Sequence, residues 1–136
     1  MAEKSFTLEI VTPRKVVFNG SVNSFSAPGV MGSFQVLFNH APMLAEIGVG
    51  EVKIQQPEGA VVRFATSGGF VEVKQNHVIL LAETIERSDE IDRSRAEAAR
   101  GRAQGRISDR AENTDVPRAR FALERAQNRL RLSAEK

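Results

Sequence analysis

The sequence predicts an all-β sandwich at residues 1–85, followed by a C-terminal antiparallel hairpin of two α-helices at residues 86–136. The composition changes abruptly between them: seven of the eight phenylalanines, eight of the ten glycines and four of the five prolines precede Glu86. Before Glu86, turn-forming residues recur at the short intervals typical of antiparallel β-domains. After it, alanines recur at helical spacing among charged residues, which predicts amphipathic helices.

Short apolar runs in the first segment end at proline, glycine or asparagine. The run at residues 6–11 alternates apolar and polar side chains and stops before Pro13, which cannot donate a hydrogen bond to a β-ladder. Glycine and asparagine tolerate positive φ, so pairs of them indicate turns. The predicted turns are Asn19-Gly20, Pro28-Gly29, Pro57-Glu58-Gly59, Ser67-Gly68-Gly69 and Gln75-Asn76. The predicted strands are residues 6–11, 16–18, 22–27, 34–38, 50–55, 61–66, 71–73 and 78–82.

The second segment predicts a helix, a polar connection and a second helix. Ser88 or Asp89 is expected to cap the first helix, and Asp115 the second. The apolar stripes are Ile91, Ala96, Ala99, Ala103 and Ile107 on the first helix and Ala119, Ala122, Leu123, Ala126 and Leu130 on the second. Because these stripes are mostly alanine, the hairpin buries little apolar area and is expected to be marginally stable. Gly101 and Gly105 weaken the first helix by about 1 kcal/mol each relative to alanine.

The residue types exclude a self-contained active site. The chain has no cysteine, which removes disulfides, thiolate metal sites and cysteine nucleophiles. Its two histidines, His40 and His77, lack the spacing of metal ligands. Gly68-Gly69 lacks the lysine and the helix of a phosphate-binding loop. We therefore expect a protein that is not itself an enzyme, holds no metal and reaches a membrane only through partners, since no run approaches the roughly 18 apolar residues of a membrane span.

Arginines of the second segment form a pattern that can bind an anion. Guanidinium groups hold phosphate oxygens through bidentate hydrogen bonds, and Glu86 or Asp92 can accept hydrogen bonds from an adenine amino group or a ribose hydroxyl. If both helices form, the arginines of each helix share one face at spacings of four, seven and eleven residues. They are Arg95, Arg102 and Arg106 on the first helix and Arg125 and Arg129 on the second.

Other interpretations of these arginines stay open on the pattern alone. They can form a solvated helix face, or they can meet an acidic protein surface, where scattered charges give steering and specificity. Nucleic acid is disfavoured, because acidic residues interleave with the arginines and no aromatic side chains accompany them as stacking platforms. The net charge of the whole chain, +2, does not separate these classes.

Several runs resemble the epsilon subunits of F-type ATP synthases. The resemblance covers essentially the whole chain and keeps the order of the motifs. The runs are Pro28-Gly29-Val30-Met31-Gly32-Ser33-Phe34-Gln35-Val36-Leu37, His40-Ala41-Pro42-Met43-Leu44, Gly68-Gly69-Phe70-Val71-Glu72-Val73, Leu81-Ala82-Glu83 and Ile91-Asp92-Arg93-Ser94-Arg95-Ala96.

This resemblance implies a role in the central stalk of a rotary, proton-translocating ATP synthase. The sandwich is expected to bind the gamma subunit and the rotor c-ring, and the hairpin to contact the alpha and beta subunits and inhibit ATP hydrolysis. Some relatives bind ATP in the folded hairpin through an Ile-Asp-x-x-Arg-Ala motif. ATP is then a regulatory ligand rather than a required cofactor. The matching residues are Glu86, Ile91, Asp92, Arg95, Ala96, Arg102, Arg125 and Arg129.

The resemblance also implies a location, and alternatives to it remain. We expect a peripheral protein on the cytoplasmic face of a bacterial inner membrane, because no N-terminal presequence is apparent before Thr7. The alternatives are a free-standing ATP-sensing module and a helical-hairpin adaptor protein. Copurification with the alpha, beta and gamma subunits distinguishes both from a stalk subunit.

Overall fold

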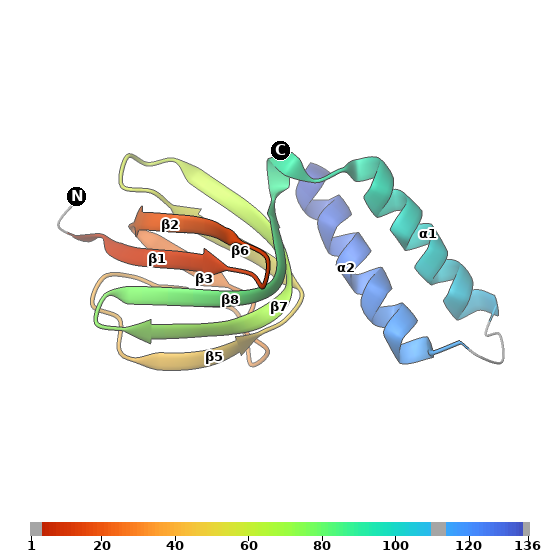
Figure 1. Cartoon of the computed structure of the whole chain (residues 1–136), viewed down its shortest axis with the longest axis horizontal. Coiled ribbons are helices and arrows are strands. Elements are labelled where there is room, and N and C mark those ends of the chain that lie inside the picture. The colour runs from red at the N-terminus through yellow and green to blue at the C-terminus, as the bar shows by residue number, and fades with distance from the viewer. Residues whose placement is uncertain (1–3, 110–113, 135–136) are drawn as a thin grey trace. The chain divides into compact units, whose positions relative to one another are not determined.

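The computed structural model describes residues 4–109 and 114–134. The chain divides into two compact units, Met1–Arg87 and Ser88–Lys136, the first built from strands and the second from helices (Figure 1). This confirms the predicted fold class. The strands are β1 (Phe6–Val11), β2 (Val16–Val22), β3 (Ser24–Ala27), β4 (Phe34–Val36), β5 (Met43–Ile47), β6 (Gly50–Gln55), β7 (Val61–Lys74) and β8 (His77–Arg87). The helices are the 3-10 turn η2 (Ser88–Glu90), α1 (Arg93–Asp109) and α2 (Val116–Ala134).

The strands form two layers that share β7 and β8. In the first layer the order is β2-β1-β8-β7-β5, with β8 parallel to β1 and β5 paired to residues 69–73 of β7. In the second layer the order is β4-β3-β6-β7-β8, with β6 paired to residues 61–66 of β7. Each of the two longest strands therefore begins in one layer and ends in the other.

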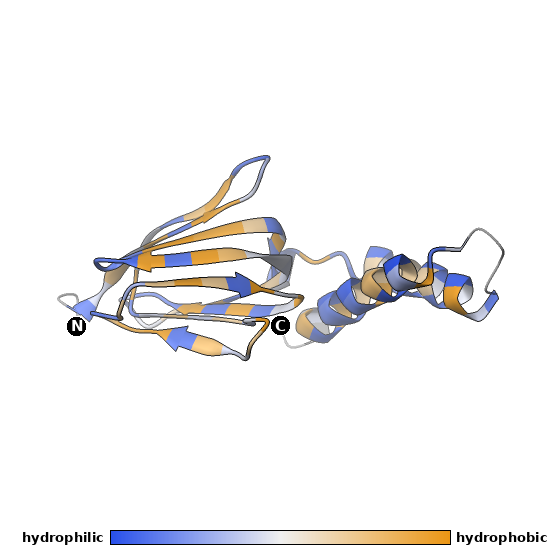
Figure 2. Ribbon diagram, turned by 90° about the horizontal axis from the view of Figure 1, so that it is seen from below, coloured by the Kyte–Doolittle hydropathy of each residue, from blue (hydrophilic) through white to orange (hydrophobic). Residues whose placement is uncertain are grey.

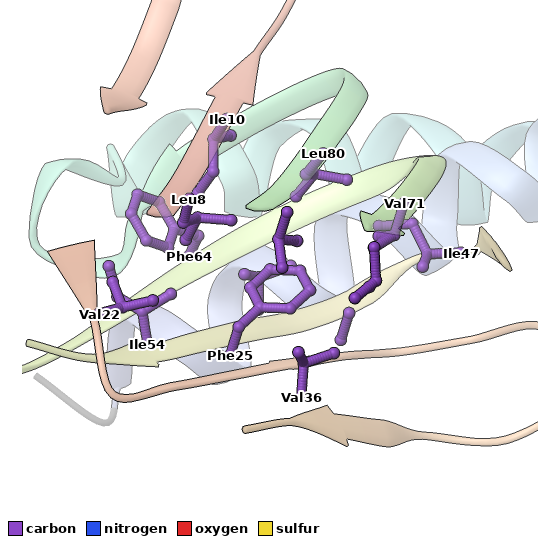
Figure 3. Close-up of a cluster of buried hydrophobic side chains, with 14 of the residues drawn as sticks. Leu8, Ile10, Val22, Phe25, Val36, Ile47, Ile54, Phe64, Val71 and Leu80 are labelled. Carbon is purple, nitrogen blue, oxygen red and sulfur yellow. The ribbon is translucent and has the colours of Figure 1, made fainter. Parts of the chain in front are cut away.

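The hydrophobic core lies between these layers. Leu8 and Leu80 of the first layer and Phe25 and Phe64 of the second are among its fully buried members (Figure 3). Alternation along the strands directs every second side chain inward, as predicted for residues 6–11. Hydrophilic residues alternate with hydrophobic ones along the strands and dominate the helices (Figure 2). Most of the large buried side chains therefore belong to the sandwich.

The run Ser67-Gly68-Gly69 is a bulge inside β7 and not the turn that we predicted. The pairing of β7 with β8 shifts register on both sides of Gly68, and the strand continues to Lys74. Gly68 and Gly69 have φ of 134° and 155°, and a Cβ on Gly69 would overlap the carbonyl oxygen of Leu81. The two glycines thus serve a close backbone approach, which lets the strand pass from one layer to the other.

Hydroxyl groups replace the hydrogen bonds that the bulge interrupts. Thr66 Oγ1 donates to the Thr84 carbonyl at 2.9 Å and accepts from the Gly68 amide at 3.2 Å. Thr84 Oγ1 lies 2.6 Å from Ser67 Oγ. Thr66 and Ser67 are buried, so these partners satisfy polar groups that water does not reach.

Two other predictions about the strands are wrong. Asn19-Gly20 is not a turn: β2 runs through it, with Glu9 opposite Asn19 and Leu8 opposite Gly20. β5, Met43–Ile47, was not predicted, because its methionine, leucine, alanine and glutamate favour helices as isolated residues. Pairing with β7 overrides that local preference.

Other boundaries differ only in extent. Residues 22–27 and 34–38 give shorter strands, Ser24–Ala27 and Phe34–Val36, and residues 78–82 lie within a longer one, His77–Arg87. The predicted Gln75-Asn76 turn is confirmed: φ is 51° at Gln75 and 59° at Asn76, the two positive values of a type I′ hairpin turn. β7 and β8 therefore form one continuous hairpin.

The first helix begins later than predicted. Ser88 and Asp89 form the 3-10 turn η2, and Asp92 is the residue that caps α1, with its Oδ1 accepting from the Arg95 amide at 3.1 Å. Ile91 therefore precedes the helix, and its buried side chain occupies the position of a hydrophobic staple toward Ala96. The predicted Asp115 cap of α2 is confirmed, with its Oδ1 accepting from the Arg118 amide at 3.1 Å.

The predicted stripes are confirmed in part, since Ala99, Ile107, Ala122 and Leu123 are only half-buried, and the buried residues Asn128, Leu132 and Ser133 of α2 were not predicted. Ala96 and Ala103 are buried on α1, and Ala119, Ala126 and Leu130 on α2. Along Arg93–Asp109, all of it described, no residue larger than alanine is buried, which supports the expectation of a marginal hairpin. α1 nevertheless continues through both of its glycines, and a Cβ on either would meet nothing within 4 Å.

Candidate functional site

A row of apolar side chains crosses the outward side of the first layer. Cross-strand pairs place Phe70 beside Leu81, Leu81 beside Val11 and Val11 beside Val16. Phe70, Leu81 and Val16 are 53%, 57% and 59% exposed, and Val11 is half-buried. We call these four residues the apolar row. Exposed large apolar side chains that gather in one place typically mark a protein-binding surface.

A shallow pocket of about 360 Å³ adjoins the apolar row. Gly69 and Leu81, whose backbones approach closely at the bulge, both line it. Its residues are Val11, Thr12, Pro13, Gly69, Phe70, Leu81, Ala82 and Glu83. Sequence reasoning missed this site. The signal in the sequence was Phe70, an apolar residue that alternation along β7 places on the same outward face as Glu72 and Lys74.

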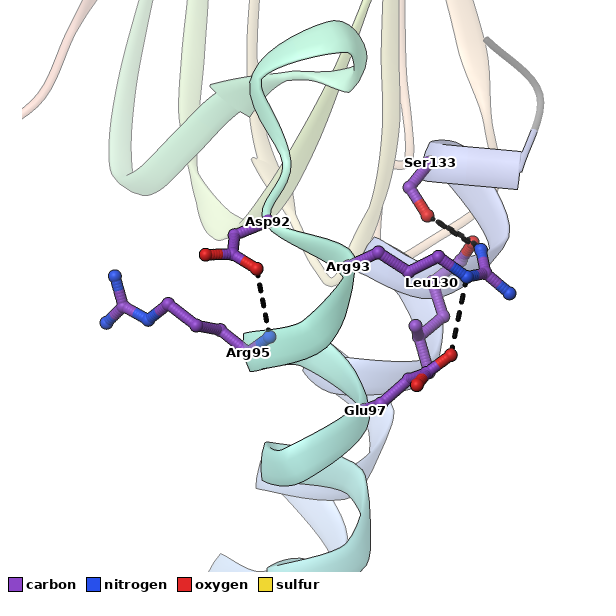
Figure 4. A network of polar contacts seen from close by, with 6 residues as sticks. All are labelled: Asp92, Arg93, Arg95, Glu97, Leu130 and Ser133. Atoms are coloured by element: carbon purple, nitrogen blue, oxygen red, sulfur yellow. Dashed lines mark hydrogen bonds and ion pairs between the residues drawn. The ribbon is translucent and has the colours of Figure 1, made fainter.

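The residues of the predicted ATP site fall into three groups. Ile91, Asp92, Arg95 and Ala96 lie at the start of α1, where the side chains of Ile91 and Ala96 are buried. Arg95 is exposed, and one oxygen of Asp92 is already used to cap the helix. The side chain of Asp92 thus bonds the Arg95 backbone amide and leaves the guanidinium directed elsewhere (Figure 4).

Arg102 is exposed two turns further along α1, about 10 Å from Arg95 at 1.5 Å per residue. Arg125 and Arg129 are half-buried on α2. The Arg125 guanidinium stacks over the Phe121 ring, 4.7 Å from its centre, a contact that sequence reasoning missed although the spacing of four residues allows it. The hairpin thus brings the arginines of both helices into one unit.

Glu86 belongs to the other unit. It lies in β8, paired with Ala65 of β7. Arg106, which shared the predicted arginine face, lines a pocket of about 320 Å³ with Asp115 and Arg118 near the start of α2.

In the described parts of the chain neither helix has the length and apolar content to cross a bilayer. No three potential metal ligands gather within residues 4–109 and 114–134.

One arginine that sequence reasoning did not assign connects the two helices. Arg93 Nη1 lies 3.0 Å from Ser133 Oγ and 3.4 Å from the Leu130 carbonyl oxygen, and its Nε lies 3.3 Å from Glu97 Oε1 (Figure 4). These contacts join the first turn of α1 to the last turn of α2. They therefore place Arg129, the neighbour of Leu130, at the same end of the hairpin as Asp92 and Arg95.

Two solved structures with a similar fold are chains of ATP synthases. The chain resembles a chain of the mitochondrial ATP synthase of Euglena gracilis, in an OSCP/F1/c-ring assembly, with a TM-score of 0.83, 18% identity and coverage of 97% of this chain and 82% of that one. It resembles a chain of the central stalk/c-ring of the Tetrahymena thermophila enzyme with a TM-score of 0.56, 16% identity and coverage of 95% and 93%. At these identities the likeness concerns the fold.

Sequence comparisons are more specific. Residues 5–88 match the β-sandwich domain of the ATP synthase delta/epsilon chain, and residues 89–134 match its long α-helix domain. An ATP synthase epsilon chain of Syntrophomonas wolfei is 42% identical, covering 98% of this chain and 97% of its own length. One of Moorella thermoacetica is 45% identical, covering 93% and 95%. These matches confirm the resemblance, and the chain belongs to the delta/epsilon chain family of ATP synthase.

Proposed function

We propose that the chain is the non-catalytic epsilon subunit of the central stalk of an F-type ATP synthase. In this function it couples proton flow to ATP synthesis by turning with the gamma subunit and the c-ring. It works on the cytoplasmic face of a bacterial inner membrane, held there by its partners. The observation that carries the proposal is a sandwich with an exposed apolar row, in a chain whose full length matches the epsilon family.

The apolar row is the proposed contact with the gamma subunit. Three large apolar side chains, each more than half exposed, lie on strands held rigidly by the core. Burying such a group against a partner removes apolar surface from water, at about 25 cal/mol per Å². Aromatic and aliphatic groups near the centre of an interface typically carry most of its binding energy. A stalk subunit that turns with gamma needs such a preformed surface.

Replacing Phe70 by glutamate is expected to weaken binding to the gamma subunit by about 2–3 kcal/mol, or roughly 30- to 150-fold in Kd. The charge would be buried at the interface without a partner, while in the free chain it stays in water. Calorimetric titration of the chain with gamma measures the change. Val61→Glu is the matched control, because Val61 is 52% exposed on the other half of the same strand. Equal weakening by both substitutions, or by neither, would exclude the apolar row as the contact.

The hairpin is the proposed site of ATP. Arg125 and Arg129 of α2 would hold phosphate oxygens together with Arg95 and Arg102 of α1. Asp92 would accept a hydrogen bond from the nucleoside. Ile91 and Ala96 would shape the helix start rather than offer side chains, since both are buried. ATP would act as a regulatory ligand that stabilises the closed hairpin.

Isothermal titration of the isolated chain with ATP is expected to show binding. Arg125→Ala is expected to lower the affinity for ATP at least about tenfold, as for a lost hydrogen bond between charged groups. Arg120→Ala, an exposed position on α2 outside the set, should leave it unchanged. An absence of heat at millimolar ATP would remove ATP as a ligand, and the arginines would then be solvated or would contact the alpha and beta subunits.

The alternatives make different predictions about assembly. A free-standing ATP sensor would bind ATP, and a helical-hairpin adaptor would bind its partner protein, without the other subunits of the synthase. Family matches across both units favour the stalk subunit over either alternative. Recovery of the chain with the alpha, beta and gamma subunits from solubilised membranes distinguishes the three.

A further inference from the structure

Arg93 carries a charge in an unfavourable place for its own helix. It is the first residue of α1, where the helix dipole is positive, and the first turn of α1 contains no acidic residue. Its partner within α1 is Glu97, four residues later, which is the weaker order for a helical ion pair. Both side chains are about half exposed, so solvent screens this pair.

The same charge is favourably placed for the other helix. The antiparallel arrangement puts Arg93 at the negative end of α2, where the helix dipole favours a positive charge. There the guanidinium reaches the Leu130 carbonyl oxygen and the hydroxyl of Ser133. Ser133 is buried, and its hydroxyl also donates to Leu130 at 2.9 Å. The contact of Arg93 with α2 is therefore the better protected of its interactions.

We propose that Arg93 is a clasp that sets how often the hairpin is closed. α1 itself buries only alanines, while Ile91 before it and Leu130 and Leu132 of α2 bury larger apolar side chains at this end, so the charge-assisted hydrogen bond of Arg93 adds a directional polar contact to that packing. Because Leu130 follows Arg129 directly, a closed clasp also keeps Arg129 at the end of the hairpin that carries Asp92 and Arg95. This second consequence rests on the proposed ATP site, whereas the closure itself does not.

Distances between spin labels test the closure in the full chain. The sequence has no cysteine, so Ala98→Cys and Gln127→Cys introduce two unique labelling positions, both exposed and on different helices. Arg93→Ala is expected to raise the population of long label distances about tenfold, as for the loss of a hydrogen bond to a charged group. Ser133→Ala should do the same. Arg100→Ala, which removes an exposed arginine from the same helix, should not.

A double variant decides whether the two residues act together. If Arg93 bonds Ser133 in solution, the Arg93→Ala/Ser133→Ala chain opens no more than either single variant. Additive effects, an Arg93→Ala distribution equal to that of Arg100→Ala, or a wild-type hairpin that is already mostly open would overturn the proposal. Amide hydrogen exchange in α2 gives a second measurement of the same opening, without labels.

The ATP consequence is tested on the same chains. Arg93→Ala should weaken ATP binding although Arg93 is outside the proposed phosphate contacts, and a cross-linker joining cysteines 98 and 127 should restore it by holding the helices together. If ATP binds the wild type and Arg93→Ala binds it equally well, Arg93 does not position the site. If the wild type binds no ATP, the proposed function of the arginines fails, and the label distances still decide the clasp.

Discussion

A Gly69→Ala chain is expected to lose more than about 3 kcal/mol of folding free energy, a large share of the roughly 5–15 kcal/mol by which folded domains are typically stable. The added Cβ would overlap the Leu81 carbonyl oxygen, and φ at this position is 155°. Relief requires β7 and β8 to separate where the strand changes layer. Chemical denaturation followed by circular dichroism measures the loss.

Gly20→Ala is the control for this substitution. Gly20 also lies within a strand, but its added Cβ would meet Phe18 at 3.4 Å, an ordinary contact. We expect its stability to stay within about 0.5 kcal/mol of the wild type, as for substitutions away from special backbone positions. A Gly69→Ala chain as stable as Gly20→Ala would show that the bulge relaxes without cost.

Deleting residues 88–136 is expected to raise ATP hydrolysis by the membrane-detached complex severalfold while leaving proton-driven synthesis largely intact. The sandwich forms a compact unit with its own hydrophobic core, so the shortened chain should still bind gamma. The hairpin, which is rich in arginine and expected to be marginally stable, is the part proposed to change its arrangement and inhibit ATP hydrolysis. Hydrolysis and synthesis rates of the two complexes provide the measurement.

A third complex makes this test decisive. A cross-link between α1 and α2 would hold the hairpin closed. The complex that contains this cross-linked chain should hydrolyse ATP about as fast as the complex that contains the shortened chain. A ligand shifts such an equilibrium only through its different affinity for the two states, so ATP should lose its effect on the cross-linked complex. Equal hydrolysis rates with the hairpin present, absent and cross-linked would rule out an inhibitory hairpin in this protein.

Local patterns identified much of the core and both helices, although they missed β5 with its buried Ile47 and the buried Leu132 of α2. Alternation identified Leu8 and Ile10 as inward-facing, and helical spacing identified Ala96, Ala103 and Ala126 as buried, because both depend only on the geometry of one element. The turn dipeptides were less reliable. A glycine indicates an unusual backbone conformation or a close neighbour, but it does not indicate whether the chain turns there. A turn was predicted at Asn19-Gly20, where the strand continues, and at Gly68-Gly69, where the strand bulges.

The functional surfaces depend on residues far apart in the chain. The apolar row exists because β1, β2, β7 and β8 lie side by side, and the pairing of β1 with β8 is parallel and cannot be read from either strand alone. Arg93 meets Ser133 across 40 positions of sequence. A periodicity argument placed the other arginines on helix faces, and only the packing of the two helices shows which charge meets which helix end.

Two strands shared between the layers have a mechanical consequence. In a sandwich of two independent sheets, a sideways force on one sheet is resisted by side-chain packing alone, and the sheets can slide over each other. Here β7 and β8 run from one layer into the other, so a load applied at Phe70 or Leu81 passes along covalent backbone into the second layer. Shear would have to break backbone hydrogen bonds on both sides of the bulge. The sandwich can therefore transmit torque as a single stiff body.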